Sequence, residues 1–207
     1  MDLILLAGGT GDRSGLPYPK PLFPIHGTPI IRILIDLFRP LVDQIIIPCG
    51  EEVAEVCTDC IIVTPGRTRQ ESVYNALQKV TTDRVIIHEA VRPFITEDFI
   101  KRIMATDGDC VVPTVSVKPT IIDTEFGTFP GRDTLLEVQL PQVFATGRLL
   151  EAHRQYDGSP WIFTDDSSLF SVVHNYWPTI IDGLDCNLKL TTPFDFKIAT
   201  AIWEAIH

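Results

Sequence analysis

Short apolar runs alternate with amphipathic stretches along most of this chain. The runs are almost continuously apolar, which is typical of strands buried on both faces of a sheet, and they lie at residues 3–6, 44–47, 60–63, 84–88 and 110–113. The amphipathic stretches predict helices at residues 29–38, 68–80, 96–104, 146–156, 164–174 and 193–206. Buried strands separated by helices predict an α/β fold of three layers, with a mainly parallel central sheet and helices on both faces.

One region departs from this alternation and predicts a projecting β-hairpin arm at about residues 114–140. Two β-rich segments, 120–124 and 134–138, flank the turn-prone residues 125–131. A hairpin that leaves the body of the protein has little core of its own, so we expect it to pack on a second subunit of a homodimer. No repeat or linker divides the chain, and residues 1–207 are therefore expected to form a single domain.

A glycine-rich loop directly after the first predicted strand carries the strongest chemical signal. Glycine brings bare backbone N–H groups close to an anion, because it has no side chain to hold the anion away. The loop residues that supply this backbone are Ala7, Gly8, Gly9 and Gly11. Arg13 and Lys20 follow and add positive charge, so the segment predicts a triphosphate site.

Two better-known glycine signatures do not describe this loop. The dinucleotide fingerprint needs a third glycine where this chain has Ser14. The other phosphate loop ends in Gly-Lys-Ser/Thr before a helix, whereas here Pro17 and Pro19 keep the chain extended. A strand-to-loop turn that uses glycine only for its conformation is the alternative that stays open.

The charge and the cysteines limit the partners and the compartment. The net charge of −10 argues against nucleic acid as a partner, because non-specific binding of nucleic acid needs a basic surface. No run reaches the roughly 18 apolar residues of a membrane span, and the chain begins with a predicted strand rather than a signal peptide. Five cysteines without regular spacing indicate reduced thiols, and Cys57-x-x-Cys60 has no second pair to complete a zinc site. We therefore expect a cytoplasmic protein with no membrane partner.

Further polar residues follow the other predicted strands, at the edge where open α/β sheets bind ligands. Residues 65–73 include Gly66 and Ser72 and lead into a helix, so they can bind a base edge or an anion. Glu89 ends a strand and is a candidate ligand for Mg²⁺, which takes one or two carboxylates together with phosphate oxygens. Lys189 also lies on a strand-like segment before a helix, and together with Arg13 and Lys20 it is a candidate cation of the site.

Three other residues have alternative interpretations. Asp165 and Asp166 follow Thr164, and a helix start explains these acids better than a direct ligand role. His88 lies at the end of a buried strand, which favours a structural hydrogen bond over a general base.

Seven segments, taken together and in order, resemble one enzyme family over nearly the whole chain. They are LAGGTGDR (6–13), PK (19–20), PGRTRQESV (65–73), HEAVRPF (88–94), PQ with Phe144 (141–144), TDD (164–166) and NLKLTTP (187–193). The chain resembles the 2-C-methyl-D-erythritol 4-phosphate cytidylyltransferase family and its close relative, ribitol-5-phosphate cytidylyltransferase. The resemblance implies a nucleotidyltransferase-type fold, a dimer joined by hairpin arms, and the transfer of CMP from CTP to a small polyol phosphate with release of pyrophosphate.

The resemblance also implies roles for individual residues. Catalysis is expected to rely on Arg13, Lys20 and Lys189, which would bind the triphosphate and the reacting phosphates. The nucleotide is expected to contact Ala7, Gly8, Gly9, Gly11, Gly66, Ser72 and Glu89. Glu89 would also hold Mg²⁺ or another divalent cation. The acceptor is expected to contact Arg92, Arg132 and Thr164, and Arg132 belongs to the arm.

Departures from the family pattern keep the acceptor open. The chain has Glu89 where the family has aspartate, and Ser116-Val117 where an Asp-Thr pair is expected. Methylerythritol phosphate, ribitol phosphate, and a phosphonate or sugar phosphate all remain candidate acceptors. A module that binds CTP without turnover and a redox enzyme on a dinucleotide fold are the alternatives from other classes.

Overall fold

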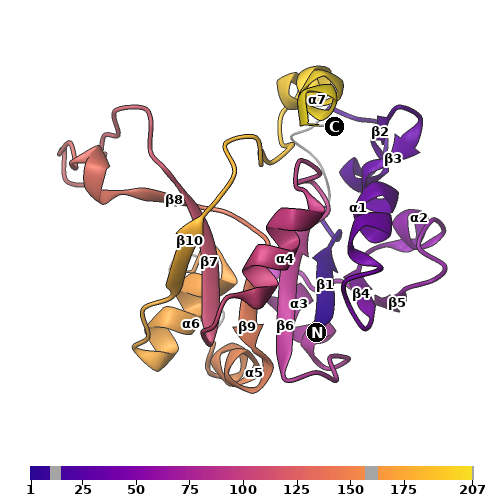
Figure 1. Ribbon diagram of the computed structural model, residues 1–207, viewed down its shortest axis with the longest axis horizontal. Coiled ribbons are helices and arrows are strands. Elements are labelled where there is room, and N and C mark those ends of the chain that lie inside the picture. The colour runs from indigo at the N-terminus through magenta and orange to yellow at the C-terminus, as the bar shows by residue number, and fades with distance from the viewer. Residues whose placement is uncertain (10–14, 157–162, 207) are drawn as a thin grey trace.

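The computed structural model describes residues 1–9, 15–156 and 163–206, and its centre is one mixed sheet (Figure 1). The strands are β1 (Asp2–Leu6), β4 (Ile45–Pro48), β5 (Ile61–Val63), β6 (Arg84–Glu89), β7 (Cys110–Ser116), β8 (Leu136–Val138), β9 (Gln142–Ala145) and β10 (Thr179–Asp182). Their order is β10-β7-β9-β6-β1-β4-β5, with β8 paired to the end of β7. Within the described residues, four pairings of this sheet are parallel and three are antiparallel. The predicted mainly parallel sheet is confirmed.

Two strands, β9 and β10, were not predicted. β9 lies antiparallel between β6 and β7, and its four residues include the fully buried polar residue Gln142, which interrupts an apolar pattern. β10 is an edge strand whose residues alternate between half-buried and exposed, so it also lacks an apolar run. Both strands depend on neighbours that are distant in the sequence.

Helices cover both faces of the sheet and produce the predicted three layers. The helices are α1 (Ile30–Phe38), α2 (Glu51–Ala54), α3 (Arg69–Leu77), α4 (Glu97–Ala105), α5 (Thr146–Gln155), α6 (Asp166–His174) and α7 (Pro193–Ile206). Leu3 and Leu5 of β1 pack with α1, α2 and α4, whereas Ile4 between them packs with α3, α5 and α6 on the other face. None of the described helices combines the length and apolar character needed to cross a membrane.

The carboxyl ends of the strands are covered by a smaller apolar cluster. Phe196 of α7 packs there with Phe94, with Ile30 of α1 and with Ile25 of a short hairpin, β2 (Pro24–Ile25) and β3 (Thr28–Pro29). Figure 1 shows α7 and this hairpin at one end of the molecule. The segment that carries Lys189 therefore enters α7 above the ends of the strands.

Helix starts follow the predicted chemistry with one correction. Thr68 and Thr96 are N-caps, whose side chains accept hydrogen bonds from the backbone N–H groups of Glu71 and Phe99. The predicted start at Thr164 is wrong by one residue, because Asp165 is the N-cap of α6 and forms a reciprocal capping box. Thr164 is thereby left exposed beside the helix start.

The arm projects from the body as expected, but its pairing differs from the prediction. β7 continues to Ser116 and pairs there with β8, with Ser116 opposite Leu136. Residues 120–124 form no strand, and Asp123 and Thr128 make an isolated bridge near the tip. The backbone groups at the end of β7 pair with β8 rather than with residues 120–124. Pro119, which has no backbone N–H group, also removes a donor from the chain that follows β7. The tip exposes Phe126 and Phe129.

Candidate active site

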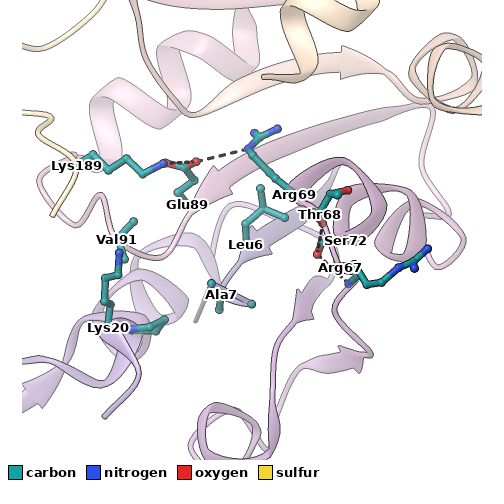
Figure 2. A pocket seen from close by; sticks show the side chains of 14 residues that line it. Leu6, Ala7, Lys20, Arg67, Thr68, Arg69, Ser72, Glu89, Val91 and Lys189 are labelled. Atoms are coloured by element: carbon teal, nitrogen blue, oxygen red, sulfur yellow. Dashed lines mark hydrogen bonds and ion pairs between the residues drawn. The ribbon is translucent and has the colours of Figure 1, made fainter. Parts of the chain in front are cut away.

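The carboxyl ends of β1 and β6 and the turn before α3 enclose a first pocket of about 500 Å³. Figure 2 shows the side chains of Lys20, Arg69, Glu89 and Lys189 around it. The lining residues are Leu6, Ala7, Gly8, Gly9, Lys20, Pro21, Gly66, Arg67, Thr68, Arg69, Ser72, Glu89, Val91 and Lys189. Five separate segments of the sequence therefore meet at the predicted edge of the sheet.

Two glycines of this pocket lie where a side chain would not fit. A Cβ atom on Gly8 would come within 2.7 Å of the Pro65 side chain, and one on Gly66 within 2.4 Å of Glu71. The Gly66 N–H donates to the Ser72 hydroxyl at 2.9 Å, and that hydroxyl donates to the Thr68 carbonyl. Close backbone approach at both positions gives the pocket walls of bare peptide groups, which suit a nucleotide.

Glu89 is the electrostatic centre of the site. Its Oε1 accepts a hydrogen bond from Lys189 Nζ at 3.0 Å and lies 3.5 Å from Arg69 Nε, while its Oε2 lies 3.3 Å from Arg92 Nε. Burial by itself would raise the pKa of the Glu89 carboxyl, but the charges of Lys189, Arg69 and Arg92 lower that pKa to about 2. Glu89 is therefore ionised throughout the physiological range.

Arg69 extends this network to a second buried carboxylate. Arg69 Nη1 lies 2.7 Å from Oδ2 of Asp166, which is fully buried at the start of α6. His153 Nε2 of α5 lies 3.1 Å from the other oxygen, Oδ1. Burial opposes ionisation of Asp166, but Arg69 and His153 together hold the pKa of that carboxyl below its ordinary value.

A second pocket of about 530 Å³ adjoins the first between β7, β8, β10 and α6. Arg69, Glu89 and Lys189 line both pockets and thus form a wall between them. Seven apolar residues also line the second pocket: Val112, Leu136, Val138, Leu140, Trp177, Pro178 and Ile180. Its polar lining is mainly hydroxyl groups, from Thr114, Thr134, Thr164, Ser167, Ser168 and Ser171.

The structure brings most of the predicted site residues together. The first pocket is lined by Ala7, Gly8, Gly9, Lys20, Gly66, Ser72, Glu89 and Lys189, and the second by Arg92 and Thr164. Arg132 lines neither pocket, although Thr134 and Leu136 of the same arm line the second one; its side chain is exposed and donates to the Lys118 carbonyl at 3.1 Å. Gly11 and Arg13 lie outside the described residues.

Two histidines and one arginine show what the sequence analysis found and missed. His88 is fully buried and hydrogen-bonded to the Arg92 carbonyl, and burial lowers its pKa to about 4, so its predicted structural role is confirmed. His153 had no suggestive neighbours in the sequence, yet it contacts Asp166. Arg69 belongs to one of the family motifs, but no role in the site was predicted for it. Its position at the start of the predicted helix was the signal that would have placed it at the ligand-binding edge of the sheet.

The residues present fit a divalent cation that is held mainly by its substrate. Glu89 is the one carboxylate among the described residues that line the first pocket, and Mg²⁺ commonly uses one or two carboxylates with phosphate oxygens and water. The described chain contains no group of three or more His, Cys, Asp or Glu residues that could hold a metal by themselves. Glu89 would therefore supply one ligand.

The low pKa of Glu89 makes a prediction about stability against acid. Because the folded-state pKa of about 2 lies below the ordinary 4.5, the ionised group stabilises the fold above about pH 4.5, and this contribution is lost as the pH falls towards 2. The difference in free energy of unfolding between the wild type and Glu89→Gln, measured with urea, should therefore be larger at pH 7 than at pH 3. The exposed, non-ionisable residue Val172 is the control, and its Ser variant should show a constant difference. An equal difference at both pH values for Glu89 would contradict the assignment.

Comparisons with known proteins found relatives that match almost the whole chain. The family model described as "IspD: 2-C-methyl-D-erythritol 4-phosphate cytidylyltransferase" matches residues 1–205. The enzyme of that name from Symbiobacterium thermophilum is 34% identical over 220 residues, covering 99% of this chain and 93% of the relative. The one from a Synechococcus species is 31% identical over 235 residues, covering 99% and 97%.

A solved structure shows the same fold. It is the 4-diphosphocytidyl-2C-methyl-D-erythritol synthase of Anaerococcus prevotii, which superposes with a TM-score of 0.85 at 24% identity and covers 98% of this chain and 95% of that one. The match of the family model over almost the whole sequence, together with the curated relatives, shows that this chain belongs to the 2-C-methyl-D-erythritol 4-phosphate cytidylyltransferase family.

Proposed function

We propose that the protein transfers the CMP group of CTP to 2-C-methyl-D-erythritol 4-phosphate and releases pyrophosphate. An oxygen of the acceptor phosphate forms a bond to the α-phosphorus of CTP, and the bond from that phosphorus to the bridging oxygen of pyrophosphate breaks. The observation that carries the proposal is the pair of adjoining pockets with a common wall of Arg69, Glu89 and Lys189. Two reacting phosphates must meet where such pockets join.

The first pocket is assigned to CTP. The backbone of Gly8 and Gly9 and the charge of Lys20 suit a triphosphate, and the resemblance adds Gly11 and Arg13. The turn built by Gly66 and Ser72 offers peptide groups to the cytosine, since the Ser72 hydroxyl already holds that turn in shape.

The second pocket is assigned to the acceptor, and its lining favours a methyl-branched one. The hydroxyl-bearing residues around the start of α6 can bond to the hydroxyl groups of a polyol, and Arg92 supplies positive charge. The apolar lining would leave additional hydroxyl groups without partners, which is unfavourable, whereas it would accept a methyl group. This observation supports methylerythritol phosphate over ribitol phosphate.

The reaction needs no protein base. A phosphate monoester is largely ionised near neutral pH, so its oxygen is already a nucleophile. The site must bring two anions together and stabilise the charge on the oxygens of the transferred phosphoryl group and of the leaving group. Lys189 can do both, because its ammonium group lies in the common wall and its side chain is 43% exposed, which leaves it able to move to a phosphate.

A divalent cation completes this electrostatic role. When bound, Mg²⁺ would neutralise phosphate charge, and Glu89 is the residue that would hold it. Glu89 lies at the boundary of the two pockets, where it can also bond to the ribose hydroxyls of the nucleotide.

We also infer that the protein is a homodimer joined through its arms. The tip exposes Ile122, Phe126 and Phe129, with exposed fractions of 54%, 72% and 68%. Apolar side chains this exposed on a thin projection have no core of their own, so a second copy is the simplest cover. Because Arg132 lines neither pocket of its own chain, its expected contact with the acceptor would have to be made in the pocket of a neighbouring copy.

The compartment proposed for this reaction is the cytoplasm. All five cysteines of the chain have free thiols, which is typical of reducing conditions.

The first test of the function is an acceptor comparison by pyrophosphate release with CTP and Mg²⁺. Methylerythritol 4-phosphate should give the highest kcat/KM, and erythritol 4-phosphate, which lacks only the methyl group, should be about 10-fold to 200-fold poorer, the range for one methyl-sized group in an apolar pocket. Ribitol 5-phosphate should also be poorer. A preference for ribitol 5-phosphate would overturn the acceptor assignment. CTP binding without pyrophosphate release for any acceptor would indicate a module without turnover.

The role of Lys189 is tested by its alanine variant. Lys189→Ala should lower kcat by about 10²-fold to 10³-fold, because transition-state charge loses a positioned cation. KM for CTP should change much less, since the walls of the first pocket stay in place. Lys101→Ala removes an exposed lysine on α4 that lines neither pocket, and it serves as the control with unchanged kcat. A near-normal kcat for Lys189→Ala would remove this residue from the mechanism.

The dimer is tested by sedimentation equilibrium. The wild type should have twice the chain mass of 23.1 kDa, and the double variant Phe126→Ser/Phe129→Ser should sediment as a monomer. Val172→Ser, which changes an exposed apolar residue of α6, should leave the dimer intact. A wild-type monomer, or a double variant that stays dimeric, would contradict the arm interface.

A further inference from the structure

We propose that Arg69 is a positioning residue that fixes the Glu89 carboxylate between the two pockets, and that Asp166 and His153 hold Arg69 in place. The inference rests on the proposed function, because it assigns a role within that reaction. Arg69 is not among the residues that the sequence analysis assigned to the site.

The first argument is the path of contacts. Arg69 is the first residue of α3, and its Nε faces Glu89 Oε1 at 3.5 Å while its Nη1 faces Asp166 Oδ2 at 2.7 Å. His153 holds the second oxygen of Asp166 at 3.1 Å. The chain of contacts thus runs from α5 through α6 and α3 to the end of β6, and it ends at the wall between the pockets.

The second argument is the difference in burial between the cations around Glu89. The side chain of Lys189 is 43% exposed, whereas those of Arg69 and Arg92 are 22% and 11% exposed. Lys189 is therefore the cation that can leave Glu89 for a substrate phosphate. Arg69 and Arg92 stay behind, and they keep the buried carboxylate paired when Lys189 moves.

The third argument concerns Asp166, which lies too deep to serve a substrate directly. Its side chain is fully buried, and a buried carboxylate is stable only when it is paired. Arg69 provides that charge, so the two residues fix each other. Buried groups that orient a ligand-binding carboxylate in this way commonly change activity about 10-fold to 100-fold when they are altered.

The test uses Arg69→Lys, which keeps a charge for Asp166 but loses the planar fork that spans two carboxylates. In the wild-type background this variant should lower kcat for pyrophosphate release at least about tenfold, with KM for CTP changed less than about threefold. In a Glu89→Gln background the same substitution should lower kcat less than about twofold, because Arg69 can no longer act through the Glu89 carboxylate.

A matched control separates this effect from general damage. Arg84 lies at the other end of β6, half-buried, and donates to the carbonyls of Met104 and Thr106. Arg84→Lys should lower the melting temperature without changing kcat. If Arg69→Lys does not fold, the second variant is Asp166→Asn, which removes the charge that holds the other end of Arg69. This variant should lower kcat in the same way.

Crystal structures give a readout that does not depend on activity. In the Arg69→Lys protein the Glu89 carboxylate should shift or occupy two conformations, whereas in the Arg84→Lys protein it should stay in place. A Glu89 carboxylate that stays in place in the Arg69→Lys protein would overturn the inference. So would a double variant whose loss of kcat equals the product of the losses in Arg69→Lys and Glu89→Gln. If the wild type released no pyrophosphate with any acceptor, the proposed function would be overturned instead. The crystal structures would then be the remaining test of whether Arg69 positions Glu89.

Discussion

The ionic contacts of one buried carboxylate, Glu89, connect the parts of this protein that must work together. Its partners come from α3, from the loop after β6 and from the segment before α7, so a single group fixes three separate regions relative to the sheet. Removing a carboxylate from water is costly, and the cost is offset here because Lys189, Arg69 and Arg92 surround it. Glu89 lines both the first and the second pocket, so it lies where the two pockets adjoin.

Cations outnumber carboxylates in the lining of both pockets, although the chain as a whole carries a net charge of −10. An acidic protein cannot attract a nucleotide through a general positive field, so a few placed cations must do so. Lys20 and Lys189 line the first pocket, and the half-buried Arg69 and Arg92 line the second. A site of this kind selects a ligand by the geometry of its phosphates rather than by long-range attraction.

The arm poses a different physical problem from the site. It places exposed aromatic side chains such as Phe126 beyond the ends of β7 and β8, where Figure 1 shows the arm standing away from the helices of the body. Arg132 of the same arm lines neither pocket of its own chain. In the proposed dimer, association through the arm would cover these aromatic side chains.

The sequence by itself determined the central strands, most of the helices and the backbone of the nucleotide pocket. The apolar runs around Ile4 and Ile46 became neighbouring central strands, and the glycines after β1 lie in the first pocket, because local periodicity and glycine conformation act over a few residues. Only the tertiary structure decided that β8 pairs with β7, that Arg69 reaches Asp166, and that Lys189 reaches Glu89 from a hundred residues away. These contacts depend on how the layers pack, and no local pattern records which buried charge will find which partner.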